Sequence, residues 1–164
     1  MAYSTKNVIG EVALINIIRI LYVGVCISFF LPMFKGEVIY LDIDELAESA
    51  ILTGFNTIFG AGNNISGSPF ALIAFMFPAV AIIATLIDFL YDRLHIVCYI
   101  MGAIGIISTI VYTVAEMIML NSSLTIFGIT IKEANGSLSW GILVPIGLYA
   151  VSVVLAFLYK KVAD

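Results

Sequence analysis

Four long apolar stretches dominate the pattern of hydrophobic and polar positions along the chain. A bilayer core about 30 Å thick needs roughly 20 apolar residues for each helical span. Stretches of about that length occupy residues 12–34, 69–91, 96–120 and 138–159. The pattern therefore predicts an all-α membrane protein, a four-helix transmembrane bundle that forms a single membrane domain over residues 1–164.

The two longer connections between these stretches contain patterns of their own. In residues 38–43, apolar and other positions alternate, which predicts a strand with one apolar face. Residues 124–131 are rich in Thr, Ile and Phe and precede a turn-like segment at 133–136. We therefore expect the outside loops, 35–68 and 121–137, to form a small extracellular β element.

Two helix signals lie before the second apolar stretch. Leu52, Phe55 and Phe59 recur at helical spacing, which predicts a short amphipathic helix at the outer membrane interface. Ser68 followed by Pro69 is typical of an N-cap and a first helical residue. The second span is therefore expected to begin there.

The positions of Lys and Arg predict the orientation, because cytoplasmic loops retain positive charge during insertion. With both termini inside, only Lys35 and Lys132 lie outside. The other five basic residues then lie on the cytoplasmic side: Lys6, Arg19, Arg93, Lys160 and Lys161. The sequence thus favours an N-in, C-in, multi-pass protein of the cell membrane, and we expect a bacterial cytoplasmic membrane.

Composition and charge exclude several classes of function. The chain is 62% hydrophobic and 11% charged, whereas a soluble domain is about 25% charged. Its net charge of −4 argues against nucleic-acid binding. Cys26 and Cys98 both fall inside predicted spans, so a membrane thiol oxidoreductase is excluded, and the single histidine, His95, cannot supply paired haem ligands. No catalytic residues, metal site or cofactor can be assigned.

A polar stripe on the third span is the most informative local feature. Its residues recur at spacings of three and four and fall on one helical face of an otherwise apolar segment: Gly102, Gly105, Thr109, Tyr112, Thr113 and Glu116. Small and hydroxylated residues of this kind let helices approach and hydrogen-bond, so the stripe should face protein. Glu116 has two interpretations: it is a proton-coupling or cation-binding group, or it extends to the outer surface beside Lys132 or Lys35.

Other charged residues also have a structural and a functional interpretation. Arg19 and Asp88 fall near the inner ends of the first two spans, so they are expected to form an ion pair that fixes helix register, or else Arg19 binds a substrate. A run of carboxylates in the first outside loop is a possible weak cation site or a solvated acidic loop: Asp42, Asp44, Glu45 and Glu48.

Two short motifs carry a resemblance to known proteins. The chain has Phe30–Leu31–Pro32–Met33–Phe34 at the end of the first span and Thr53–Gly54–Phe55 in the loop after it. It resembles small, mostly uncharacterised bacterial membrane proteins with four spans. The layout is also similar to claudins, although the first loop lacks Trp and paired cysteines, so only the architecture carries over.

These observations favour a non-enzymatic accessory or assembly protein, with lipid and another membrane protein, or a second copy of itself, as its partners. The alternative is a small transporter or channel that uses Glu116 and the polar face of the third span. An enzyme is not expected, because no nucleophile, base and orienting group can be assembled from these residues.

Overall fold

The computed structural model describes residues 5–40, 47–60, 67–87, 93–121, 124–126 and 129–163. In chain order the elements are α1 (Thr5–Ser28), β1 (Pro32–Tyr40), β2 (Ala47–Thr53), α2 (Gly54–Phe59), α3 (Pro69–Ala84), α4 (Leu94–Leu120), β3 (Leu124–Ile126), β4 (Ile129–Leu138), the 3-10 helix η2 (Trp140–Ile142) and α5 (Leu143–Ala163). The protein is mainly helical and carries one small sheet.

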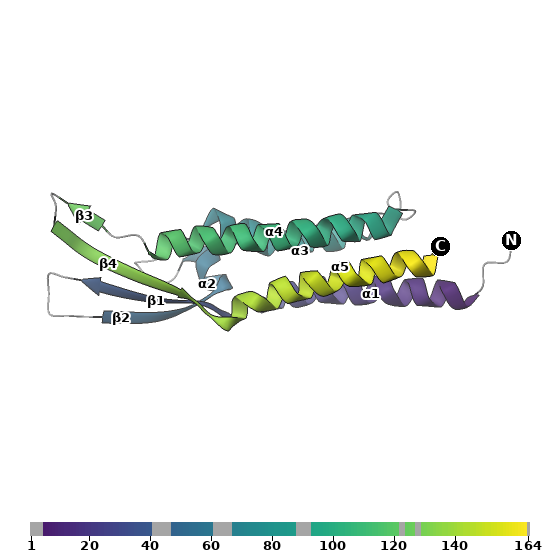
Figure 1. Cartoon of the computed structure of the whole chain (residues 1–164), viewed down its shortest axis with the longest axis horizontal. Helices are drawn as coiled ribbons and strands as arrows, with labels where there is room; N and C mark the ends of the chain where they lie inside the picture. Colours follow the sequence, from purple (N-terminus) through teal and green to yellow (C-terminus); the bar gives the residue numbers. More distant parts are fainter. Residues whose placement is uncertain are drawn as a thin grey trace.

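The four longest helices run along one axis and form a bundle (Figure 1). Helix α1 packs against α3 and α5, and α4 packs against the same two helices, so the four close into a ring. α1 begins and α5 ends at one end of the bundle, while the sheet extends the other end (Figure 1). We call these the terminal end and the sheet end.

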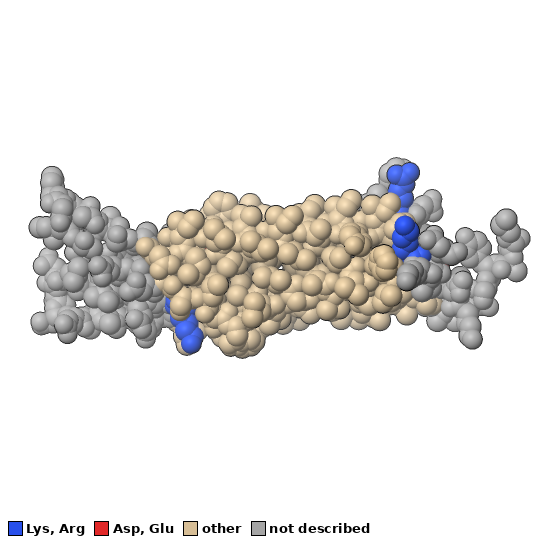
Figure 2. All heavy atoms as spheres, viewed as in Figure 1, with Lys and Arg blue, Asp and Glu red and all other residues tan. Residues whose placement is uncertain are grey.

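Three of the helices, α1, α4 and α5, are long enough and apolar enough to cross a membrane. The shorter α3 has 16 residues and is also apolar. Figure 2 shows Lys and Arg side chains near the two ends of the described surface, and in this view the surface between them carries no charged side chain. Such a belt is what a bilayer requires of the surface that it contacts.

The sheet has four antiparallel strands in the order β2-β1-β4-β3. Strand β1 lies between β2 and β4: Gly36 is opposite Ala50 on one side and Gly136 on the other. The Ser139 N–H donates to the Met33 carbonyl over 2.8 Å, which ties the end of β4 to the start of β1. The sheet is therefore built from the two long connections, as the sequence predicts.

Polar caps fix the short helices at the sheet end. α2 begins after Thr53, whose hydroxyl accepts from Asn56 N–H at 3.1 Å. α3 begins at Pro69, after the N-cap Ser68, whose hydroxyl accepts from Ala71 N–H at 3.4 Å. Each cap satisfies an N–H group that the first turn of a helix leaves without a partner.

The predicted end of the first span is wrong. We expected one helix over residues 12–34, but α1 ends at Ser28 and Pro32–Tyr40 is β1. Leu31 precedes Pro32, and a residue before proline disfavours helical backbone, while proline itself lacks the N–H that a helix needs. The apolar residues Met33 and Phe34 are thus not part of the span: they lie in β1 and are buried.

The predicted turn at 133–136 is also wrong, because these residues lie within β4. Gly136 N–H donates to Asn121 Oδ1 at 3.0 Å, and a Cβ at Gly136 would lie 2.5 Å from Leu120 Cβ. The glycine is required by this close approach to the end of α4, and pairing with β1 overrides its turn preference. Of residues 124–131, expected as one strand, 124–126 form β3 and 129–131 begin β4, while 127 and 128 lie outside the described residues.

The remaining boundaries differ by smaller amounts. The amphipathic helix expected over 52–59 is α2, from Gly54 to Phe59, and the residues before it belong to β2, which the sequence did not predict. α4 begins at Leu94, and α5 with η2 covers 140–163. The end of the predicted second span, 88–91, lies outside the described residues.

Candidate functional site

The two glycines of the polar stripe lie against α5 of the same chain. A Cβ at Gly102 would be 2.5 Å from Val153 Cγ2. A Cβ at Gly105 would overlap the ring of Tyr149, with 2.5 Å to its Cζ and 2.6 Å to its Cδ1. The glycines therefore allow α4 and α5 to approach each other, and their contact surface is already covered by this chain.

The hydroxyl groups of the stripe are satisfied close by. Thr109 Oγ1 donates to Gly105 O at 2.9 Å, and Thr113 Oγ1 donates to Thr109 O at 2.7 Å. Thr109 is buried and Thr113 is half-buried. These bonds run within α4, so neither hydroxyl has its donor directed toward a ligand.

Tyr112 connects the stripe to α2. Its hydroxyl lies 2.7 Å from Thr57 Oγ1, which donates its own proton to Gly54 O at 2.7 Å. The Tyr112 hydroxyl also lies 3.7 Å from Met33 Sδ, so its proton has two possible acceptors, Thr57 Oγ1 and Met33 Sδ. The ring of Tyr112 is packed between Phe29, at 5.9 Å between centroids, and Phe34, at 5.5 Å. This buried contact holds the sheet end of the bundle together.

Glu116 lies one turn beyond Tyr112 and is buried, with 5% of its surface exposed. Ser68, the N-cap of α3, is the hydroxyl that interacts with its carboxyl group. The second carboxyl oxygen, Oε1, has no hydrogen-bond partner among the described residues. Lys35 is exposed on β1, and the side chain of Lys132 lies outside the described part of the structure. Glu116 is thus held inside the bundle rather than extended to the surface.

Arg19 caps the C-terminal end of α3. Its Nη2 donates to the carbonyl of Thr85 at 2.7 Å and its Nε donates to Thr85 Oγ1 at 3.0 Å. Its Nη1 donates to Asn16 Oδ1 at 3.2 Å. Thr85 is the C-cap of α3, where carbonyl groups have no partner in the helix and the helix dipole is negative. Asp88, the expected partner of Arg19, lies outside the described residues.

Two buried tyrosines between α1, α4 and α5 were not found from the sequence. Tyr22 donates to Cys98 O at 3.3 Å, and its ring lies 6.0 Å from the ring of Tyr149. Tyr149 is 1% exposed, and its hydroxyl has no hydrogen-bond partner among the described residues. Each stands alone among apolar neighbours in the sequence, so its residue type gave no signal of an interior position. Cys26 and Cys98 are free thiols.

The acidic run of the first long connection lies mostly outside the described residues. Asp42, Asp44 and Glu45 lie outside the described residues. Glu48 lies in β2 opposite Val38, but its side chain is not described. Within the described ranges, no group of three or more His, Cys, Asp or Glu side chains is arranged to hold a metal ion.

The outer surface at the sheet end carries an exposed apolar patch beside an open sheet edge. Phe55 stacks on Phe30, with 5.0 Å between ring centroids, and lies 4.8 Å from Phe59. Ile51 in β2 and Phe59 are 65% and 67% exposed. We call Phe30, Ile51, Phe55 and Phe59 the outer patch. In the described part of the chain, β2 pairs only with β1, so its other edge has no strand beside it.

Comparisons with known proteins give no relative: no family model, no curated protein and no solved structure matches this chain.

Proposed function

We propose that this chain is a multi-pass protein of the bacterial cytoplasmic membrane that crosses the bilayer four times, with both termini in the cytoplasm. In this proposal it has no enzymatic activity and serves as an accessory or assembly protein. It binds another membrane protein through β2 and the outer patch. The observation that carries the proposal is the open edge of β2 beside that patch.

The arrangement of the helices supports four crossings. α3 lies between α1 and α4 and runs along the same axis as the three helices that are long enough to span (Figure 1). Its 16 residues cover about 24 Å at 1.5 Å per residue, most of a hydrocarbon core. An even number of crossings is also consistent with the start of α1 and the end of α5 at one end of the bundle.

The choice between surfaces supports the sheet end as the binding site. The stripe on α4 is buried against α5 and α2 of the same chain, so it is not available to a partner. A strand edge, by contrast, presents backbone N–H and C=O groups that another strand can pair with. A strand of another protein can pair with those groups, and the exposed apolar patch beside the edge adds buried area.

Topology is tested by labelling single cysteines with a membrane-impermeant maleimide, after Cys26 and Cys98 are replaced by Ala. Ser137→Cys on β4 should react in intact cells, and Lys160→Cys on α5 should react only after the membrane is opened. Both positions are exposed, so equal accessibility is expected in opened cells. Labelling of both positions from the same side would refute the four-span arrangement.

Partner binding is tested by purification from the native membrane in mild detergent, followed by native mass spectrometry. We expect a stoichiometric foreign subunit that is retained with wild type and lost with Ile51→Lys, which places a charge beside the open edge. Ser137→Lys is the matched control, because it adds the same charge to the same sheet away from β2 and should keep the subunit. A clean monomer or homo-oligomer from wild type would contradict the proposal.

A second candidate function, a small transporter, is favoured by one observation. Glu116 is buried and its Oε1 has no partner among the described residues, which is the state expected of a carboxylate that takes up a proton or cation. Flux assays in liposomes test it with Glu116→Gln, and Glu11→Gln on α1 serves as the control. Equal flux of every ion tried through wild type and Glu116→Gln would remove this candidate.

A further inference from the structure

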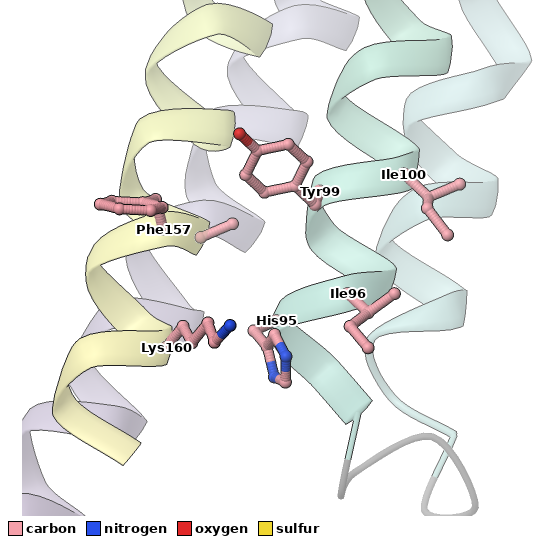
Figure 3. A pocket seen from close by; sticks show the side chains of 7 residues that line it. His95, Ile96, Tyr99, Ile100, Phe157 and Lys160 are labelled. Carbon is pink, nitrogen blue, oxygen red and sulfur yellow. The ribbon is translucent and has the colours of Figure 1, made fainter. Parts of the chain in front are cut away.

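A groove between α4 and α5 opens near the terminal end of the bundle. Its volume is about 360 Å³, within the range of sites that hold small ligands. Figure 3 shows the side chains that line it: His95, Ile96, Tyr99, Ile100, Ala156, Phe157 and Lys160. None of these residues belongs to the polar stripe or to the outer patch.

The groove is apolar along its length and polar at one end. Phe157 and Tyr99 lie deeper along the bundle, while Lys160 of α5 extends toward His95 of α4 at the end nearest the terminus (Figure 3). Ala156 is 1% exposed, and its small side chain leaves room between the helices. The wall of the groove thus fits a hydrocarbon chain, and its mouth offers a cation and an imidazole N–H to an anion.

We propose that this groove binds one anionic phospholipid, with an acyl chain along Tyr99 and Phe157 and the phosphate at Lys160 and His95. The inference rests on the membrane placement proposed above, but not on a protein partner.

Charge and position favour this occupant over others. Lys160 is exposed at the mouth of the groove. Arg93, two residues before His95, is exposed at the start of α4. Basic side chains at this depth, between transmembrane helices, attract the phosphate of an anionic lipid. The apolar side chains that continue from the mouth are exposed on the outer face of the bundle, where a lipid chain reaches them laterally and a soluble anion does not.

Fluorescence quenching in bilayers tests the proposal. The chain has one tryptophan, Trp140, so Trp140→Phe removes the background and Tyr99→Trp places a reporter in the groove. The double variant is reconstituted with brominated phosphatidylglycerol or with brominated phosphatidylcholine. One basic side chain near the surface contributes about 1 kcal/mol, so we expect the anionic lipid to bind about fivefold more tightly.

Two further variants locate the source of the preference. Lys160→Ala should reduce the ratio of the two lipids to about one, and His95→Ala should reduce it in part. Lys35→Ala is the matched control, because it removes an exposed lysine at the sheet end and should leave the ratio unchanged. Inorganic phosphate should not compete with the lipid, because binding in the groove requires the acyl chain as well as the headgroup.

The other outcomes overturn the proposal, and they can be told apart. Equal quenching by both lipids in the reporter protein means that only ordinary surrounding lipid is present, and membrane placement then stands. Loss of the preference on addition of inorganic phosphate means that the mouth binds a free anion. If neither lipid quenches the reporter, the groove is not in the bilayer, and the membrane placement fails together with the lipid site.

Discussion

The contact between Gly105 and Tyr149 provides the sharpest test of the packing. A methyl group at Gly105 would overlap three ring atoms of Tyr149, with 2.5 Å to Cζ. The ring cannot turn away easily, because Tyr149 is 1% exposed and packs against Tyr22 at 6.0 Å between centroids. Gly105→Ala must therefore separate α4 from α5 or displace both rings.

The expected effect is the difference between two opposing contributions. Overpacking of a buried site costs roughly 1–3 kcal/mol, whereas Gly→Ala within a helix gains about 1 kcal/mol. Because backbone geometry and a buried ring both resist movement here, we expect Gly105→Ala to lower the free energy of unfolding by about 1–2 kcal/mol. At Gly147 on α5, a Cβ would meet nothing within 4 Å, so Gly147→Ala should raise the free energy of unfolding by up to ~1 kcal/mol.

The measurement is equilibrium unfolding in mixed micelles with increasing dodecyl sulfate, followed by circular dichroism. The free energies of unfolding of the two alanine variants should differ by about 1–3 kcal/mol, and they can be compared directly because both change the same residue type in facing helices. Tyr149→Leu in the Gly105→Ala background should recover part of the loss, because it removes the ring that the methyl group meets. Equal stability of Gly105→Ala and Gly147→Ala would refute the close packing of α4 on α5 at this point.

Two further predictions concern buried polar groups and use the same unfolding measurement. Tyr149→Phe should leave the free energy of unfolding unchanged or raise it by up to ~2 kcal/mol, because the Tyr149 hydroxyl has no hydrogen-bond partner among the described residues. Tyr112→Phe should lower the free energy of unfolding by about 1 kcal/mol, because it removes the bond to Thr57. If Tyr149→Phe lowers the free energy of unfolding as much as Tyr112→Phe does, the Tyr149 hydroxyl forms a hydrogen bond and this prediction is wrong. Arg19→Met should lower the free energy of unfolding by about 1.5–3 kcal/mol, because Thr85 loses two hydrogen bonds from a charged donor, and a stability equal to wild type would show that Arg19 does not cap α3.

The sequence predicted the helices better than the strands, for a physical reason. A long apolar segment that crosses a membrane forms an α-helix, because a helix satisfies its own backbone N–H and C=O groups. The positions of α1, α4 and α5 therefore follow from hydropathy alone. Strand β2, Ala47–Thr53, shows no alternation that could reveal it, because its pairing with β1 comes from tertiary contact. Pro32 indicates that α1 ends before it. The apolar residues on both sides of this proline, however, led to the prediction of one continuous span.

The polar stripe illustrates a different limit. Helical spacing in the sequence places Gly102, Gly105 and Thr109 on one face, and in the structure these residues are buried. Helical periodicity predicts that this face is buried, but it does not predict which segment packs against it. Here α5 provides the cover through Tyr149 and Val153. A stripe of small residues in a membrane helix is thus as consistent with packing inside the chain as with a partner.

Two charged side chains among the described residues, Glu116 and Arg19, have a common structural explanation through α3. Glu116 of α4 interacts with Ser68 at the N-cap of this helix, and Arg19 of α1 binds Thr85 at its C-cap. A helix is partially positive at its N-terminus and partially negative at its C-terminus, so a carboxylate at the first end and a guanidinium at the second both complement the dipole. The charges therefore need not pair with each other. This placement accounts for the position of Glu116 without a transported ion, and for this reason the transporter is the second candidate rather than the first.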